Sequence, residues 1–190
     1  MARQSVALFG GSFNPPHVGH VLAIAHVLST ELCQQVLVVP VFEHALRKQL
    51  APFEHRVEMS RRAFDWLPRT QVSTIEERLG APSRTLRTVI ALQAEHPDWD
   101  LRLMVGSDIL GEIHQWHAFD EIERRAPPLV LRRAGSSAGG KAPSLLPQIS
   151  STEVRNLLGA AEQNAAELTQ LVPRAVLEYV RENALYRSVP

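Results

Sequence analysis

The chain has little cysteine and no excess of charge of either sign. Its 190 residues contain one cysteine, Cys33, so no disulfide can close within the chain. Such usage is expected of a cytoplasmic protein, and we expect Cys33 to be a buried, inert thiol. The chain has 20 basic residues (Lys and Arg) and 20 acidic residues (Asp and Glu). This balance argues against a general nucleic-acid-binding protein, because such proteins carry a basic excess.

Long apolar runs are also missing. No apolar segment approaches the length that spans a membrane, and the first residues lack the pattern of a signal peptide. We therefore expect no membrane association. The length is that of one domain with ample chain for a single core, so we expect residues 1–190 to form one domain.

The most informative stretch runs from Gly10 to His20 and reads GGSFNPPHVGH. A short apolar strand precedes it and an Ala/Leu-rich helix follows it. Gly10 and Gly11 permit positive φ and a close approach of the backbone to a ligand. The following helix N-terminus offers N–H groups and a favourable dipole end to an anion. His17 and His20 share one helical face, and each imidazole can donate a hydrogen bond to a phosphate.

The residues alone leave this motif open to other interpretations. A Gly-Gly turn after a strand is common. The two histidines could also be a surface pair or half of a metal site. Phosphate binding is therefore a hypothesis that the structural context must decide.

Strands and helices alternate along the chain, and several of the strands are apolar throughout. This order predicts an α/β fold with a doubly wound parallel sheet. The expected strands are Ser5–Phe9, Val36–Pro40, Gln71–Ile75, Leu101–Val105 and Pro128–Arg133. The expected helices are Val18–Glu31, Phe53–Phe64, Ser83–Glu95 with Ser83 as N-cap, Phe119–Arg125 and Pro173–Tyr186.

Candidate binding residues follow several of the predicted strands, where ligands bind in open parallel sheets. The second strand leads into a polar connection with Lys48, and Arg56, Arg61 and Arg62 of the next helix are expected on a solvated face. The fourth strand ends in Gly106-Ser107-Asp108. Asp108 could accept a hydrogen bond from a ribose hydroxyl or be only a helix N-terminal residue. Trp116 could stack on a ring or belong to the core.

The C-terminal part contains a second anion-binding candidate. Residues 134–147 are rich in Gly, Ser, Ala and Pro, and we expect a mobile surface loop there. The sequence ISSTEVR follows from Ile149 to Arg155. Its hydroxyl residues and Glu153 are typical of a helix start, and its arginine could also complete a polyphosphate clamp. We expect residues 151–187 to form a small helical part of the domain.

The two motifs together resemble those of a known family. Gly10–His20 is similar to the N-terminal signature of the HxGH nucleotidyltransferases, and most similar to that of the nicotinate/nicotinamide mononucleotide adenylyltransferases. Ile149–Arg155 is similar to the Ile-Ser-Ser-Thr-x-x-Arg motif of the same enzymes. Gly106-x-Asp108, Trp116 and the end from Leu171 to Tyr186 also resemble the family, so the likeness covers nearly the whole chain.

The resemblance implies an adenylyltransferase with ATP and a pyridine mononucleotide as its partners. The implied catalytic residues are His17, His20 and Arg155. The residues implied to bind ATP are Gly10, Gly11, Ser12, Phe13, His17, His20, Gly106, Asp108, Ile149, Ser150, Ser151, Thr152 and Arg155. Those implied to bind the mononucleotide are Ser12, Asn14, Lys48, Thr85 and Trp116. Mg²⁺ is the implied cofactor, bound through the ATP phosphates and not by protein ligands.

The chemistry expected of such an enzyme needs no protein nucleophile. The acceptor phosphate is already anionic and attacks the α-phosphorus of ATP in line, so catalysis rests on alignment and charge stabilisation. The acceptor side departs from the family pattern, because Thr-x-Asp-Thr reads Thr85-Leu86-Arg87-Thr88 and the usual Pro-His-Lys reads Glu43 to Lys48. Another phosphate acceptor, such as phosphopantetheine, and an inactive nucleotide-binding module therefore stay open as alternatives. The oligomeric state, including a homo-oligomer, is also open.

Overall fold

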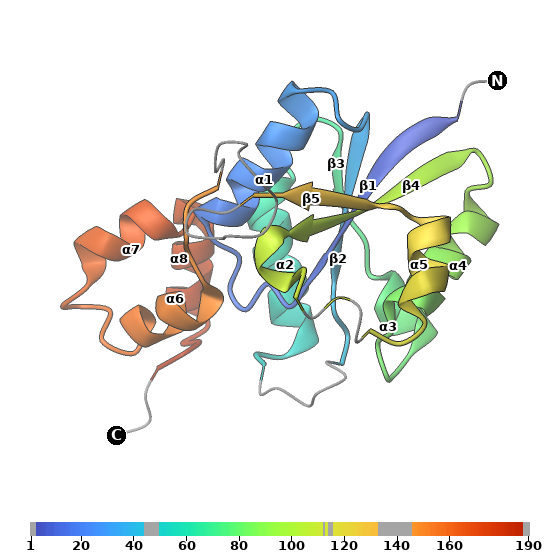
Figure 1. Cartoon of the computed structure of the whole chain (residues 1–190). Helices are drawn as coiled ribbons and strands as arrows, with labels where there is room; N and C mark the ends of the chain where they lie inside the picture. The colour runs from blue at the N-terminus through green and yellow to red at the C-terminus, as the bar shows by residue number, and fades with distance from the viewer. Residues whose placement is uncertain (1–2, 44–49, 112, 114–115, 133–145, 188–190) are drawn as a thin grey trace.

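The computed structural model describes residues 3–43, 50–111, 113, 116–132 and 146–187. A five-stranded sheet with the order β3-β2-β1-β4-β5 forms its centre, and all strand pairs are parallel (Figure 1). The strand order reverses between β1 and β4. In parallel sheets of this kind the ligand crevice lies at the carboxyl ends of the strands on either side of such a reversal.

The strands are β1 (Gln4–Gly11), β2 (Gln35–Pro40), β3 (Thr70–Val72), β4 (Trp99–Gly106) and β5 (Pro128–Leu131). The helices are α1 (Val18–Ser29), α2 (Phe53–Phe64), α3 (Ile75–Leu79), α4 (Thr85–Glu95), α5 (Phe119–Arg125), α6 (Ser151–Leu158), α7 (Ala165–Leu171) and α8 (Arg174–Glu182), with a 3-10 turn η1 at Ser107–Ile109.

Apolar side chains cover both faces of the sheet, as the continuous apolar strands predict. Val6 and Leu8 of β1 pack on one face with residues of α3, α4 and α5. Ala7 packs on the other face with residues of α1, α2 and the C-terminal helices. Figure 1 shows these helix layers on opposite sides of the sheet. The predicted doubly wound α/β fold is confirmed.

Several predicted boundaries are wrong. The third strand ends at Val72, and Ile75 begins the short helix α3 with its side chain buried against α4 residues. Ser83 does not cap α4, because Arg84 is the N-cap and the Ser83 hydroxyl instead accepts a hydrogen bond from the Glu43 N–H at 3.1 Å. Cys33 is a free, buried thiol, as predicted, and burial raises its pKa.

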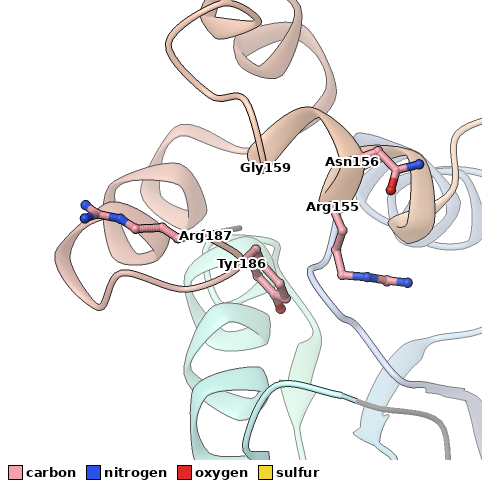
Figure 2. Close-up of a pocket in the computed structure, with 5 residues that line it drawn as sticks. All are labelled: Arg155, Asn156, Gly159, Tyr186 and Arg187. Atoms are coloured by element: carbon pink, nitrogen blue, oxygen red, sulfur yellow. The ribbon is translucent and has the colours of Figure 1, made fainter. Parts of the chain in front are cut away.

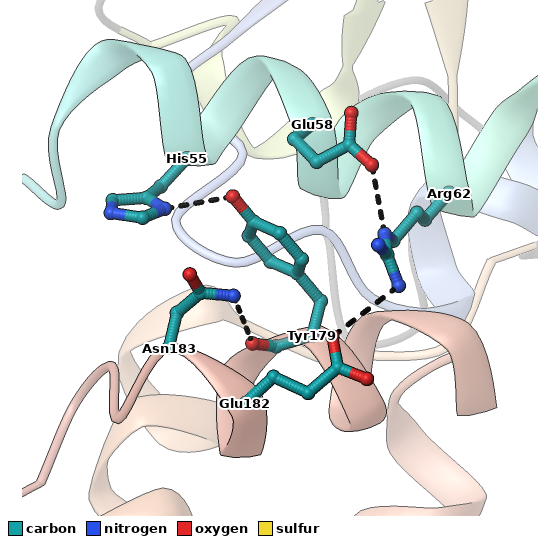
Figure 3. Close-up of polar contacts among 6 residues, drawn as sticks. All are labelled: His55, Glu58, Arg62, Tyr179, Glu182 and Asn183. Atoms are coloured by element: carbon teal, nitrogen blue, oxygen red, sulfur yellow. Dashed lines mark hydrogen bonds and ion pairs between the residues drawn. The ribbon is translucent and has the colours of Figure 1, made fainter.

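The C-terminal helices form a small lobe beside α1 and α2, shown in orange and red in Figure 1. Polar contacts join α8 to α2 (Figure 3). The Tyr179 hydroxyl and the His55 Nδ1 form a 2.8 Å hydrogen bond, and the Arg62 guanidinium lies over the Tyr179 ring at 4.6 Å. Arg62 also pairs with Glu58 at 2.9 Å and contacts Glu182 at 3.9 Å. These contacts fix the position of the segment that follows α8.

The predicted mobile loop at 134–147 lies outside the described residues except for its last two. Of those, Leu146 is buried, and its N–H donates to the Arg132 carbonyl at 3.1 Å. In the part of the chain that the structure describes, no helix has the length and apolar content needed to cross a membrane.

Candidate active site

The loop between β1 and α1 lies at the carboxyl edge of the sheet, where it leads from Gly11 to the N-cap His17. Gly10 and Gly11 are the last residues of the strand, and neither has positive φ, so the conformational freedom that glycine permits is not used here. Positive φ occurs instead at Phe13, with a φ of 46°. The Phe13 ring packs closely against Gly11, where an added Cβ would lie 3.0 Å from the ring, so this position requires glycine.

The two histidines of the motif lie together at the start of α1. Their rings stack with centroids 3.7 Å apart. The His17 N–H donates to His20 Nδ1 at 3.1 Å, which makes Nδ1 the acceptor and places the ring proton on Nε2. His17 is 2% exposed, and its ring lies so near Gly19 that an added Cβ would be 3.1 Å from Cε1 and Nδ1. Gly19 therefore keeps space for the His17 ring, which explains the glycine between the histidines.

The C-terminal motif docks on this loop, 136 or more residues away in the sequence. Ser151 Oγ donates to the Pro15 carbonyl at 2.9 Å, and Arg155 Nη1 donates to the Asn14 carbonyl at 2.8 Å. Arg155 Nη2 also donates to Thr152 Oγ1 at 3.2 Å. Ser150 is the N-cap of α6 and accepts from the Glu153 N–H at 3.1 Å, as the capping pattern predicts. The two candidate anion-binding motifs therefore lie against one another.

A hollow of about 400 Å³ borders this site, lined by Arg155, Asn156, Gly159, Tyr186 and Arg187 (Figure 2). Both Arg155 and Tyr186 also contact Asn14 of the loop after β1. Ile149, just before α6, is buried in the core and anchors the motif to the sheet.

The end of β4 lies beside the end of β1, on the other side of the reversal in strand order. Gly106 ends the strand, and Asp108 follows in η1 with an exposed side chain. The parallel pairing places Asp108 at the same edge of the sheet as the two histidines. Ligands bind at this edge in open parallel sheets, and Asp108 also occupies the helix-start position of the simpler interpretation.

The acceptor side is only partly described. Thr85 is the half-buried first residue of α4. Trp116 is half-buried: one part of its side chain packs against the core on the α4 and α5 face, and the rest is exposed. Lys48 lies outside the described residues. Arg87, which replaces an aspartate of the family pattern, donates to the carbonyls of Leu79, Gly80 and Pro82 and so fixes the turn before α4.

Arg56 is the principal residue that the sequence prediction misplaced. It was expected on a solvated face, but it is 2% exposed and donates to four backbone carbonyls. Arg61 is exposed, as predicted. The signal was present in the spacing, because Arg56 shares the helical face of Phe53 and Ser60, which are also buried.

Tyr186 and Asn14 form a second buried contact that sequence reasoning missed. Asn14 is 1% exposed, and its Oδ1 accepts hydrogen bonds from the Tyr186 hydroxyl at 2.8 Å and from the Ala51 N–H at 3.0 Å. Burial raises the pKa of Tyr186 well above its usual range, so the phenol stays protonated as a donor. Only the similarity of Leu185-Tyr186 to the family's C-terminus pointed to this residue.

The site combines donors suited to an anion. Imidazoles, a guanidinium, hydroxyls and the first N–H groups of α1 converge at one edge of the sheet. Among the described residues, no group of three or more His, Cys, Asp or Glu side chains is arranged to hold a metal ion. A donor set of this kind favours a polyphosphate ligand that brings any metal with it.

Comparison with known proteins agrees with this chemistry. Residues 8–157 match the model of the cytidylyltransferase-like family. That match spans the sheet and both motifs, and it defines the chain as a nucleotidyltransferase.

Similar proteins show which family of nucleotidyltransferases the chain belongs to. A protein of Anaeromyxobacter sp. (strain K), named "Probable nicotinate-nucleotide adenylyltransferase", is 42% identical over 188 residues, which cover 97% of this chain and 98% of the relative. A protein of Myxococcus xanthus with the same name is 40% identical, over 95% of this chain and 94% of the relative. The chain belongs to the nicotinate-nucleotide adenylyltransferase family.

A solved structure shares the fold. The Plasmodium falciparum nicotinic acid mononucleotide adenylyltransferase, solved in complex with NaAD, has a TM-score of 0.83 and 18% sequence identity to this chain. The likeness covers 96% of this chain and 97% of that one.

Proposed function

We propose that the protein transfers AMP from ATP to nicotinate mononucleotide, with release of pyrophosphate and formation of nicotinate adenine dinucleotide in NAD biosynthesis. The observation that carries this proposal is the docking of Arg155 and Ser151 on the loop after β1. This docking brings together the two motifs that resemble the phosphate-binding motifs of the family. The names of the relatives support nicotinate mononucleotide as the acceptor.

The mechanism uses the residues at the edge of the sheet. We assign the triphosphate to the loop at Gly10–Phe13, to His17 and His20, and to Ile149–Arg155. We assign the ATP ribose to Gly106 and Asp108. The acceptor phosphate attacks the α-phosphorus in line, and pyrophosphate leaves. Because charge moves toward the β-phosphate, donors fixed near it lower the barrier without proton transfer.

The acceptor is assigned to the opposite side of the crevice. Ser12 and Asn14 lie on the loop that both substrates share, Lys48 supplies a point charge for the mononucleotide phosphate, and Thr85 and Trp116 flank the pyridine ring. An ammonium on a flexible stem suits a monoester phosphate, and an aromatic side chain offers the ring a stacking surface.

Mg²⁺ fits this site as a companion of ATP. Hydroxyl, imidazole and guanidinium groups dominate the site, so the phosphate oxygens and water would hold the ion. When bound, Mg²⁺ neutralises charge on the phosphates. We further propose that residues 1–190 form one catalytic domain and that the reaction takes place in the cytoplasm, where ATP is available.

An acceptor assay tests the proposed function. Pyrophosphate release is measured with ATP and, in separate reactions, nicotinate mononucleotide, nicotinamide mononucleotide and phosphopantetheine. We expect the highest kcat/KM with nicotinate mononucleotide. Turnover with phosphopantetheine alone would assign the protein to a different acceptor, and no turnover with any of them would indicate a binding module without catalysis.

A further inference from the structure

Arg56 joins the loop after β1, which the proposed function gives to both substrates, to the segment with Lys48, which it gives to the acceptor alone. Its Nη1 donates to the Ser12 carbonyl at 3.1 Å, in the loop assigned to ATP. The same guanidinium donates to Val41 at 2.7 Å, Phe42 at 3.1 Å and Ala51 at 2.9 Å, on both sides of the segment that contains Lys48. One buried side chain therefore holds both ends of the segment 41–51, here named the acceptor loop, against the loop after β1, here named the phosphate loop.

Burying the positive charge of Arg56 costs free energy of folding. Among the described residues no carboxylate forms an ion pair with Arg56, and burial lowers its pKa. The acidic groups that act on it from a distance are Tyr186, Glu54 and Glu76. Glu76 itself accepts hydrogen bonds from the Phe42 N–H and the Thr88 hydroxyl. A buried guanidinium whose partners are carbonyls keeps a planar fork of fixed geometry, which an ammonium cannot reproduce.

A second contact joins the same loops. Asn14 Oδ1 accepts from the Ala51 N–H at 3.0 Å, and Ala51 is also the residue whose carbonyl accepts from Arg56. The Tyr186 hydroxyl donates to the same Asn14 oxygen at 2.8 Å. Phosphate loop, acceptor loop and C-terminal segment thus meet at two buried polar groups.

We propose that Arg56 is a positioning residue that sets the acceptor phosphate in line with the α-phosphorus of ATP, and that Tyr186 supports it through Asn14. The proposal rests on the proposed function. Under the proposed function the triphosphate is also held by His17, His20 and Ile149–Arg155, so loosening the contact between the two loops leaves binding of ATP nearly intact. Alignment between the two substrates is lost, and a misplacement of about 1 Å at a reacting centre can cost about 10²-fold in rate.

The test compares Arg56→Lys with wild type and with Val27→Ala. Lysine keeps the positive charge but cannot donate in a planar fork. Val27 is fully buried near the far end of α1, so its variant weakens the core without touching either loop. Initial rates are measured well below the melting temperature of each variant, with ATP and nicotinate mononucleotide varied in turn.

We expect Arg56→Lys to lower kcat by about 10²-fold while KM for ATP changes less than about threefold. Val27→Ala should keep the wild-type kcat although it melts earlier. A wild-type kcat in folded Arg56→Lys overturns the positioning role, and so does an equal loss in both variants. An inactive wild type refutes the proposed function instead, and this inference with it.

If Arg56→Lys does not fold, Tyr186→Phe tests the positioning role instead. It removes a single hydroxyl from the supporting contact and keeps the ring. We expect kcat to fall by about threefold to tenfold with KM for ATP unchanged, because the loop is displaced by less. An unchanged kcat in this variant overturns the proposal.

Discussion

A methyl group at Gly19 should separate activity from stability in this protein. Gly19 is the second residue of α1, and the Gly19→Ala Cβ would lie 3.1 Å from Cε1 and Nδ1 of His17. Ordinary contacts of this type lie between 3.4 and 4 Å. The His17 ring must therefore move by a few tenths of an ångström, and the His20 ring stacked on it at 3.7 Å must follow.

The two effects can be estimated separately. Alanine in place of glycine in the middle of a helix stabilises by about 0.5–1 kcal/mol, which is an upper bound for Gly19 in the first turn and partly offsets the cost of moving the two rings. The free energy of unfolding should therefore change by less than about 1 kcal/mol. A shift of a few tenths of an ångström in the two imidazoles to which we assign the triphosphate should lower kcat/KM for ATP by about threefold to tenfold.

Denaturant unfolding and pyrophosphate release check the two halves of this prediction. Gly111→Ala is the matched control, since a Cβ at Gly111 meets nothing within 4 Å. It should leave kcat/KM unchanged. If Gly19→Ala retains the full kcat/KM, the close fit between Gly19 and His17 has no functional meaning and the reasoning is refuted.

Three other predictions concern single side chains. His17→Ala and His20→Ala should each lower kcat by about 10²-fold or more with little loss of stability, measured by kinetics and thermal unfolding, because the charge that we assign to both imidazoles exists only when the ligand is bound. Lys48→Ala should raise KM for the mononucleotide and leave KM for ATP nearly unchanged; equal effects on both would place the acceptor phosphate elsewhere. Burial raises the pKa of Tyr186, so the folded state holds the phenol proton more tightly than the unfolded chain, whose tyrosines titrate near about 10. The stability that the protonated Tyr186 contributes is therefore present below about pH 10 and is lost above it. Between about pH 9 and about pH 11, the free energy of unfolding, measured with denaturant, should fall less steeply in Tyr186→Phe than in wild type. The same pH dependence in both proteins would contradict this prediction.

Much of the fold could be predicted because it depends on local pattern. Apolar strands such as Val36–Pro40 and the amphipathic Phe53–Phe64 carry their structure in the spacing of apolar residues, and both are confirmed. The strand predicted at Gln71–Ile75 was wrong because Ile75 serves the core from a helix, which the alternating pattern cannot distinguish over so few residues. The prediction gave residues 151–187 as helical without separating α7, a seven-residue helix with little pattern to detect.

The site could be predicted only where the residues form a contiguous motif. The histidine pair and the Ser150 cap follow from spacing, and both have the expected local geometry. The docking of Arg155 on Asn14 is a contact across 141 residues, which only the family resemblance anticipated. Arg56 was misplaced because a charged residue on an amphipathic helix is normally solvated, and its carbonyl partners come from two distant loops. The ligand assignments of individual residues stay predictions.

A crystal structure with a non-hydrolysable ATP analogue tests the central claim most directly. The account predicts that the triphosphate contacts the loop at Gly10–Phe13, the imidazoles of His17 and His20, and the Arg155 guanidinium in a single site. A triphosphate bound away from either motif, or contacting the histidines without Arg155, would contradict the claim that the two motifs form one site.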